Sequence, residues 1–337
     1  MKEFVTESVA NYVSDPISDA ATQPLADVMR VVFCCAGTKA QPWLDGLRTI
    51  LPGADVSEWQ PGAPPADYAV VWAPPQQFLN EQTALKALFN IGAGVDALMK
   101  LQLPPDVPVV RLDDAGMSVQ MAEYVCHAVI RHFRAFDGYA ADVAIGKWSY
   151  RKPNLREDFP IGVLGLGVLG QRVCAALGQF DFPIRGWSRS AKTVPGVQCF
   201  SGSAGLTEFL AGSRILVCLL PLTPETENIL NKDTLGRLLP GAYLINVARG
   251  GHLVDDDLMV LLDSGHLSGA TLDVFRNEPL PITDRFWRHP NITLTPHTSA
   301  RTLRDESMAQ IAGKIKALHS GAAIASIAGV VDPQQGY

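Results

Sequence analysis

Short apolar runs alternate with longer stretches of helical periodicity along most of the chain, from residue 30 onward. Apolar runs of about four to eight residues bounded by glycine, proline or polar residues are typical of buried strands, and an apolar residue at every third or fourth position is typical of a helix packed on one face. The alternation of the two patterns predicts an α/β fold, in which parallel sheets carry helices on both faces.

The first part of this pattern predicts a small α/β unit with one early helix over residues 42–50. A long helical stretch over residues 119–139 then leads away from this unit. The expected strands of the unit cover residues 30–35, 54–58, 68–72, 87–91 and 109–112.

The second part predicts a larger α/β unit, followed by a final helix over residues 303–320 that is long enough to cross back to the first unit. We therefore expect a Rossmann-type doubly wound parallel sheet in a nucleotide domain at residues 119–299. A smaller, discontinuous, flavodoxin-like substrate domain is expected at residues 29–118 and 300–337. The expected strands of the larger unit cover residues 161–164, 183–187, 214–220, 242–247, 270–274 and 292–295.

Residues 1–28 are polar and show no sustained period. We expect them to form a disordered N-terminal extension, or an extension upstream of a natural start near Met29, and we assign them no function.

A glycine-rich turn follows the strand at residues 161–164 and precedes a helical pattern. Such a turn brings backbone N–H groups and the positive end of a helix close to a pyrophosphate, with no Cβ in the way. The same glycine spacing also arises in tight strand-to-helix packing, so the motif alone is weak. It predicts a dinucleotide site formed by Gly165, Gly167, Val168, Leu169 and Gly170.

The residues after the next strand indicate which dinucleotide is bound. An acidic residue normally binds the ribose 2′-OH roughly twenty residues beyond the turn, but this chain has Ser188, Arg189 and Ser190 there, with Lys192 just beyond. A hydroxyl and a guanidinium can bind a 2′-phosphate that a carboxylate would repel. We expect NADPH to be preferred and NADH to be possible, the alternative being a solvated basic loop.

Three chemically suited residues follow later strands, where an open α/β sheet places its ligand crevice. Arg249, Glu278 and His297 come after the strands ending at residues 247, 274 and 295. The histidine can protonate a carbonyl oxygen, the glutamate can hold the imidazolium, and the arginine can bind an anionic substrate. Each has an ordinary alternative: a helix-end or surface arginine, a turn glutamate before proline, and a hydrogen-bonded histidine. The other six histidines are interpreted as structural or exposed.

Composition narrows the class of protein. The 337 residues are 47% apolar, which suits two cores, and the formal charge of −6 without a long basic run argues against a nucleic-acid surface. No apolar run approaches the roughly 18 to 20 residues of a membrane span, and no signal peptide pattern opens the chain. We therefore expect a cytoplasmic protein. We expect no metal site, because the six cysteines show no metal-type pairing and four of them lie in apolar patterns as reduced packing residues.

Five segments together resemble, in order, the signatures of the D-isomer-specific 2-hydroxyacid dehydrogenases. The resemblance extends from about Met29 to the C-terminal tail, and the combination is specific although each piece is modest. The segments are the glycine-rich turn, Leu220-Pro221-Leu222-Thr223-Pro224-Glu225-Thr226, Asn246-Val247-Ala248-Arg249-Gly250, Leu272-Asp273-Val274-Phe275 through Glu278-Pro279, and Thr295-Pro296-His297.

The resemblance implies roles for matching positions. Arg249, Glu278 and His297 would be the catalytic set, with Glu278 and His297 as a proton relay, and Asp273 would hold the nicotinamide carboxamide. The loop Gly92-Ala93-Gly94-Val95-Asp96 resembles the one whose backbone N–H groups bind the substrate carboxylate, which implicates Ala93 and Gly94, although it is also a plain strand-to-helix turn. Further cofactor contacts are implied for Leu220, Pro221, Val247 and Ala248.

Two tryptophans and one helix are further candidates, for substrate binding and for dimerisation. Trp72 is expected to face the crevice and limit the size of the substrate, although a core tryptophan is equally plausible. The family dimerises through the helix that opens the nucleotide domain, here residues 121–139, and related reductases send a tryptophan into the partner's active site. Trp148 stands in a comparable place.

The resemblance implies an NADPH-dependent reductase of small 2-oxo acids, converting glyoxylate to glycolate and hydroxypyruvate to D-glycerate, with His297 as the general acid. Ser188-Arg189 departs from the family's acidic ribose ligand, and Gly-Ala-Gly in the carboxylate loop is less bulky than in many relatives, which leaves substrate breadth open. Formate dehydrogenases pair the histidine with glutamine, so Glu278 argues against them. A dinucleotide-sensing corepressor of the same fold remains an alternative.

Overall fold

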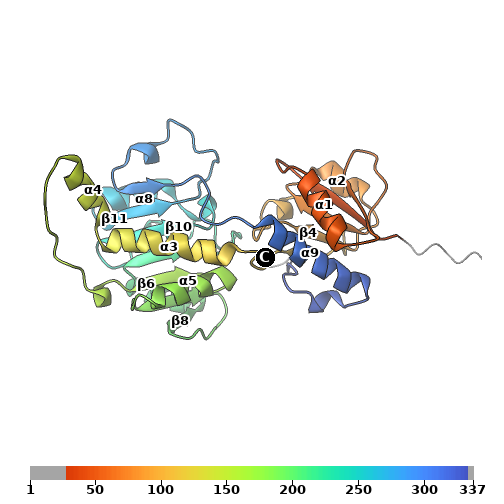
Figure 1. Ribbon diagram of the computed structural model, residues 1–337. Coiled ribbons are helices and arrows are strands. Elements are labelled where there is room, and N and C mark those ends of the chain that lie inside the picture. Colours follow the sequence, from red (N-terminus) through yellow and green to blue (C-terminus); the bar gives the residue numbers. More distant parts are fainter. Residues whose placement is uncertain (1–27, 333–337) are drawn as a thin grey trace, which may run out of the picture.

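The computed structural model of the protein describes residues 28–332, which form two lobes joined by a narrow waist (Figure 1). The expected extension at residues 1–28 lies outside the described residues except for its last position, and so does the C-terminal segment 333–337. Each lobe is built on its own parallel sheet.

The first lobe contains a five-stranded sheet in the order β2-β1-β3-β4-β5, with every neighbouring pair parallel. This order is that of flavodoxin-like sheets and places the carboxyl ends of all five strands at one edge. The strands are β1 (Arg30–Cys35), β2 (Asp55–Glu58), β3 (Tyr68–Trp72), β4 (Ala87–Asn90) and β5 (Val109–Arg111).

A helix from the far end of the chain completes this lobe. Met308, Ile311 and Ile315 of α9 (Arg304–His319) share one core with α1 (Gln41–Ile50) and the first sheet. The two helices pack so closely that a Cβ on Gly46 would lie 2.4 Å from the sulfur of Met308. A third, shorter helix of the lobe is α2 (Gln76–Glu81).

The second lobe contains a seven-stranded parallel sheet in the order β12-β11-β10-β9-β6-β7-β8. The chain starts at β6 in the middle, runs outward to β8, and returns to β9 on the other side of β6. The strand order therefore reverses between β6 and β9, which is where a Rossmann-type sheet opens a ligand crevice. The strands are β6 (Ile161–Leu164), β7 (Ile184–Ser188), β8 (Val197–Ser201), β9 (Ile215–Cys218), β10 (Ala242–Asn246), β11 (Leu267–Leu272) and β12 (Ile292–Leu294).

Helices cover both faces of this sheet, as the alternating pattern predicts. Val125 and Val129 of α3 pack with Val173 and Leu177 of α5 over one face, and a separate apolar core fills the other face. The helices of this lobe are α3 (Met117–Phe133), α4 (Phe136–Ala144), α5 (Val168–Gly178), α6 (Gly202–Ala211), α7 (Lys232–Leu235) and α8 (Asp255–Asp263).

The prediction of one continuous helix over residues 119–139 is wrong. The backbone of Ala135 lies in the left-handed region, with φ of 52°, and separates α3 from α4. Phe133 at the end of α3 packs edge-on against Phe159 and Phe182, and an ion pair joins Arg131 to Asp137 across the break. Burial of Phe133 and this ion pair stabilise the turn, which helical periodicity alone cannot reveal.

Other elements were not anticipated from the pattern. The edge strand β8 and the helices α6 and α8 have no counterpart in the prediction. The strand was missed because it is only partly buried and its apolar pattern is short. The helix expected after the glycine-rich turn is present as α5, but it begins at Val168, inside the turn.

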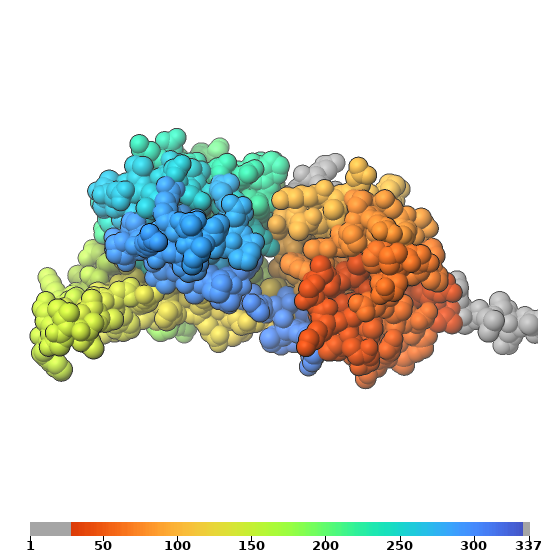
Figure 2. Space-filling model, turned by 90° about the horizontal axis from the view of Figure 1, so that it is seen from above, coloured from red at the N-terminus to blue at the C-terminus, as the bar shows by residue number. Residues whose placement is uncertain are grey.

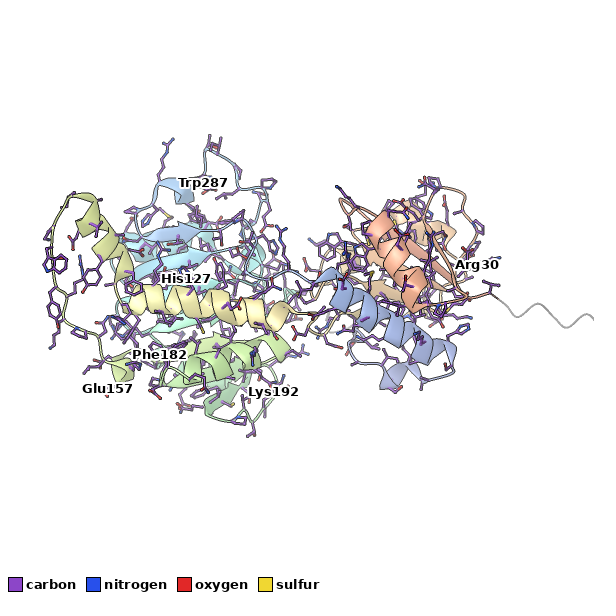
Figure 3. The ribbon with its side chains drawn as sticks, in the orientation of Figure 1. Arg30, His127, Glu157, Phe182, Lys192 and Trp287 are labelled. Carbon is purple, nitrogen blue, oxygen red and sulfur yellow. The ribbon has the colours of Figure 1, made fainter. Side chains whose placement is uncertain are left out.

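All six cysteines are free, and within residues 28–332 no helix is both long and apolar enough to cross a membrane. Figure 3 shows how densely side chains fill both lobes.

Candidate active site

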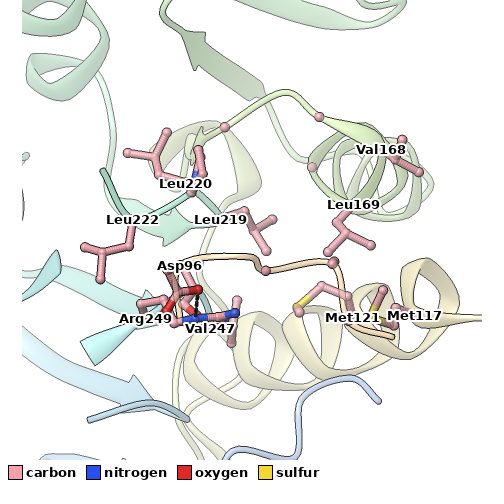
Figure 4. Close-up of a pocket in the computed structure, with 18 of the residues that line it drawn as sticks. Asp96, Met117, Met121, Val168, Leu169, Leu219, Leu220, Leu222, Val247 and Arg249 are labelled. Atoms are coloured by element: carbon pink, nitrogen blue, oxygen red, sulfur yellow. Dashed lines mark hydrogen bonds and ion pairs between the residues drawn. The ribbon is translucent and has the colours of Figure 1, made fainter. Parts of the chain in front are cut away.

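A cavity of about 920 Å³ lies between the two lobes and is lined by both of them (Figures 2 and 4). The five-stranded lobe contributes Trp72 and residues 91–96, and the seven-stranded lobe contributes the glycine-rich turn and the segments after β7, β9 and β10. Every residue expected to bind the cofactor or substrate lines this cavity except Asp273. Of the expected catalytic residues, Arg249 and His297 line it and Glu278 lies behind His297.

The glycine-rich turn requires small residues for two different reasons. A Cβ on Gly170 would lie 1.9 Å from the carbonyl oxygen of Gly165, and Gly165 itself has φ of 101°. These two glycines allow the helix to pack tightly on the strand. Nothing lies within 4 Å of the Cβ position of Gly167, which faces the cavity at the start of α5. The turn thus leaves open space at the N-terminus of a helix, where backbone N–H groups favour a phosphate.

The segment after β7 lines the cavity with hydroxyl and cationic side chains. The Ser188 hydroxyl donates to the carbonyl oxygen of Ser190 at 2.8 Å and is buried, and the Lys192 ammonium donates to the carbonyl oxygen of Leu166 at 2.9 Å. Lys192 therefore braces the glycine-rich turn. A hydrogen bond from Thr223 and the charge of Arg189 hold the pKa of Glu225, across the cavity, below its ordinary value.

His297 and Glu278 form a hydrogen-bonded pair. Nδ1 of His297 lies 2.7 Å from Oε2 of Glu278, and Oε1 of Glu278 accepts a bond from the backbone N–H of Phe275 at 2.9 Å. Because an ionised carboxylate only accepts hydrogen bonds, the pair favours a proton on Nδ1. Among residues 28–332, none makes a hydrogen bond to Nε2, and the imidazole lines the cavity.

Asp273 shapes the turn that presents His297. Its fully buried carboxylate accepts bonds from the backbone N–H groups of Thr298 and Ser299, each at 2.8 Å, and from the Thr295 hydroxyl. The Asp273 carbonyl accepts the N–H of His297 at 2.8 Å, and His297 adopts φ of 53°. These contacts are with the turn, and Asp273 is not among the residues that line the cavity. The nicotinamide contact that the resemblance implies stays a prediction.

Arg249 reaches from the seven-stranded lobe to the other lobe. Its Nε lies 3.1 Å from Oδ1 of Asp96, and its Nη1 donates to the carbonyl oxygen of Ala248 at 2.7 Å (Figure 4). A Cβ on Gly94 would lie 1.8 Å from Nη2, so that edge of the guanidinium lies against the loop. Two of the three guanidinium nitrogens thus have protein partners, and Nη2 faces Gly94.

A buried asparagine forms the loop that Arg249 contacts. The Asn90 amide donates to the carbonyl oxygens of Gly92 and Gly94, at 2.9 and 3.0 Å. The Trp72 indole lies against Gly92, where a Cβ would meet the ring at 2.5 Å, and Trp72 is 36% exposed toward the cavity. Sequence reasoning gave no role to Asn90 or Asp96. A polar residue at the end of the otherwise apolar strand β4 was the available signal for Asn90.

Between residues 28 and 332, no group of three histidine, cysteine, aspartate or glutamate residues is arranged to hold a metal ion. The site combines a glycine-rich turn, an imidazole–carboxylate pair and a guanidinium around one cavity.

Comparisons with known proteins agree on one family. A family model for the D-isomer specific 2-hydroxyacid dehydrogenase NAD-binding domain matches residues 126–299. A protein from Serratia proteamaculans named glyoxylate/hydroxypyruvate reductase A is 48% identical over 316 residues, covering 92% of this chain and all of the relative. A similarly named protein from Yersinia enterocolitica is 43% identical over the same span.

Solved structures resemble the whole described fold. A D-isomer specific 2-hydroxyacid dehydrogenase from Xanthobacter autotrophicus, in complex with NADPH and MES, has a TM-score of 0.87 at 40% identity and covers 92% of this chain. An NADPH-dependent glyoxylate/hydroxypyruvate reductase from Sinorhizobium meliloti, in complex with NADP and sulfate, has a TM-score of 0.85 at 33% identity and the same coverage. In both cases the whole of the neighbour's chain is covered.

Proposed function

The chain belongs to the D-isomer specific 2-hydroxyacid dehydrogenase family, and we propose that it reduces glyoxylate to glycolate and hydroxypyruvate to D-glycerate, with NADPH preferred over NADH. The observation that carries this proposal is the His297–Glu278 pair at 2.7 Å, on a cavity that also holds Arg249 and the glycine-rich turn. The relatives described above are named as reductases or dehydrogenases, so they lend no support to a corepressor.

The cavity fits a dinucleotide. Open space at Gly167 and close backbone packing at Gly165 and Gly170 leave room for a pyrophosphate at the N-terminus of α5. Arg189, with Ser190 and Lys192, supplies positive charge and donors where a 2′-phosphate would lie. Bound NADPH supplies a hydride.

The chain's own residues supply the proton and hold the substrate. The imidazolium of His297 donates from Nε2 to the developing alkoxide, while Glu278 holds Nδ1 and stabilises the charged ring. The substrate carboxylate is bound by Nη2 of Arg249 and by the backbone N–H groups of Ala93 and Gly94. Trp72 at the cavity wall limits the size of the group on the carbonyl carbon.

We also propose the division of the chain into a substrate domain, residues 29–118 and 300–337, and a nucleotide domain, residues 119–299. Packing of α9 on α1 supports the discontinuous substrate domain.

The cytoplasmic location of the protein stays a prediction.

A homodimer is the proposed assembly, formed by α3, α4 and the segment that follows. Helix α4 and the segment that follows it stand at the end of the molecule away from the five-stranded lobe (Figures 1 and 2), whereas Met117 and Met121 of α3 line the cavity. The apolar side chains of α4 and of the following segment are exposed, which is typical of an interface. They are Phe136, Val143, Ile145, Trp148, Tyr150 and Leu155. Light scattering in solution tests the dimer, and a monomer would exclude it.

Absorbance of reduced cofactor tests the reaction. We expect purified protein to oxidise NADPH in the presence of either oxo acid, with a higher kcat/KM for NADPH than for NADH. Absence of turnover together with tight NADPH binding would favour a sensor and contradict the proposal.

A further inference from the structure

A fully buried histidine lies between two turns of the cavity. His252 ends the short 3₁₀ helix η3 (Gly250–His252), three residues after Arg249. Its Nδ1 lies 3.0 Å from the carbonyl oxygen of Arg249, and its Nε2 lies 3.2 Å from the carbonyl oxygen of Pro221. The ring therefore contacts one backbone carbonyl with each nitrogen.

The two carbonyls belong to turns with different proposed tasks. Pro221 follows β9 and lies on the part of the cavity assigned to the dinucleotide, whereas Arg249 follows β10 and faces the substrate loop. Each carbonyl also accepts from donors outside the ring: the Asn246 amide at 3.1 Å and the backbone N–H of His252 at 3.2 Å for Arg249, and the Thr226 hydroxyl at 2.6 Å for Pro221. The imidazole is thus not needed merely to satisfy either oxygen, and its distinctive effect is to fix the distance between the turns.

We propose that His252 is a positioning residue that couples the Arg249 turn to the Pro221 turn and so sets the spacing between the oxo acid and the dinucleotide. This inference rests on the proposed reductase function. The neighbouring backbone leaves little freedom for compensation, because a Cβ on Gly250 would lie 1.9 Å from the carbonyl carbon of Phe275. The turn is thus packed closely against Phe275, and His252 adds a contact that links it to Pro221.

Opposing effects act on the pKa of His252. Burial lowers the pKa of His252, and the charge of Arg249 acts in the same direction, while the two carbonyls and Asp96 oppose them. The imidazole is therefore neutral at neutral pH. A neutral ring carries one N–H, so it donates one hydrogen bond, to the carbonyl of Arg249 or to that of Pro221, and packs against the other carbonyl.

Two substitutions separate the two contacts. The amide nitrogen of asparagine occupies nearly the place of Nδ1 in histidine, and that of glutamine nearly the place of Nε2. His252→Asn should keep the contact to Arg249 and lose the one to Pro221, and His252→Gln should do the reverse. The substitution that removes the single hydrogen bond of the neutral ring should change an equilibrium constant by about threefold to tenfold, and the other substitution should change it less.

The experiment measures the NADPH dissociation constant by cofactor fluorescence, together with kcat and the KM for hydroxypyruvate. We expect His252→Asn to affect mainly the NADPH dissociation constant and His252→Gln to affect mainly the hydroxypyruvate KM or kcat. The variant that loses the hydrogen-bonded contact should change its parameter by about threefold to tenfold, and the other variant should change its own parameter less. If both variants shift the same parameters, or if neither shifts any of them, the coupling role is refuted.

A matched control lies outside the cavity. Nε2 of His266 also lies 3.2 Å from a backbone carbonyl, that of Leu235, so His266→Asn removes a similar contact without touching the site. Thermal unfolding of each variant identifies any that do not fold. If one His252 variant does not fold, the other still tests the contact that it removes. A wild-type protein without reductase activity would refute the proposed function. An active wild-type protein would refute only this inference if its two His252 variants do not differ in whether NADPH binding or the hydroxypyruvate parameters change.

Discussion

The two lobes, which Figure 2 shows side by side, contribute to the same cavity in different ways. The seven-stranded lobe brings reactive side chains, among them Arg249 and His297, each on a turn at the carboxyl end of a strand. The five-stranded lobe brings mainly backbone, in the loop that Asn90 holds, together with the Trp72 ring and the carboxylate of Asp96.

The groups proposed for proton transfer therefore lie within one lobe, whereas the group proposed to bind the substrate lies at the junction of the two lobes. The His297–Glu278 pair and the Asp273 anchor lie entirely within one lobe, so their geometry is independent of how the lobes are placed. The guanidinium of Arg249 is oriented by the other lobe, through Asp96 and Gly94. Substitutions in the first group should therefore affect the chemical step, and substitutions at the junction should affect the capture of the oxo acid.

The sharpest test on the chemical side is His297→Ala. Loss of a general acid costs on the order of a hundredfold to ten thousandfold in kcat, while NADPH binding should stay within about twofold, since an imidazole contributes no contact to the phosphates. Steady-state kinetics and cofactor fluorescence measure the two quantities. The exposed imidazole of His319 at the end of α9 provides the control His319→Ala. Wild-type turnover in His297→Ala would exclude the assigned role.

At the junction, Gly94→Ala should disturb Arg249 most. The new methyl group would lie 1.8 Å from Nη2, so the guanidinium must move, and displacement of a substrate-binding group by about 1 Å can cost roughly a hundredfold in kcat/KM. We expect the loss mainly in the KM for the oxo acid. Gly313→Ala on α9, where nothing lies within 4 Å of the Cβ position, is the control in the same lobe. An unchanged KM in Gly94→Ala would mean that this contact is not used.

Arg189→Ala tests cofactor choice, which the seven-stranded lobe alone should decide. Loss of a charged hydrogen bond costs about 1.5 to 3 kcal/mol, so NADPH affinity should fall roughly tenfold to a hundredfold while NADH affinity changes little. The matched control is Arg172→Ala, which removes an exposed guanidinium of α5 outside the cavity. Equal losses for both cofactors would rule out contact with the 2′-phosphate.

Acid should weaken the seven-stranded lobe first. His132 of α3 stacks on Tyr243 of β10 with ring centroids 4.0 Å apart, and burial lowers the pKa of His132 from 6.5 to about 4. The unfolded chain binds this proton more tightly, so the contribution is complete above the unfolded pKa and falls by about 2 kcal/mol between pH 7 and pH 5. Denaturant unfolding at the two pH values measures the loss. His132→Phe, which keeps a stacked ring, should show a flatter pH dependence, and equal slopes would contradict this assignment.

The smallest expected effect is at Asp96. Asp96→Ala removes the acceptor for Nε of Arg249 and should raise the oxo acid KM by about twofold to tenfold. Asp96→Asn retains an oxygen at that position and should stay closer to wild type. The exposed pair partner Asp45 on α1 provides the control Asp45→Asn. If the alanine and asparagine variants lose the same amount, charge and not orientation is what Asp96 supplies.

Prediction from the sequence was accurate where information is local. Apolar runs located strands β1, β3, β6 and β10 to within about two residues, because a buried parallel strand is apolar on both faces. The break at Ala135 and the edge strand β8 were missed because contacts with distant residues, and not periodicity, determine them. The role of Asp273 likewise depends on the turn at residues 297–299, which approaches it only in the folded chain.

The linear order of residues by itself determined the α/β class, the dinucleotide turn and the appearance of Arg249, Glu278 and His297 after successive strands, since strand and helix patterns are local and parallel strands end at one edge. Only the tertiary structure decided that Arg249 faces Asp96, 153 positions away, and that His252 lies between two turns. Such contacts depend on how lobes and turns approach one another in space, to within about an ångström, and no local pattern of side chains carries that distance.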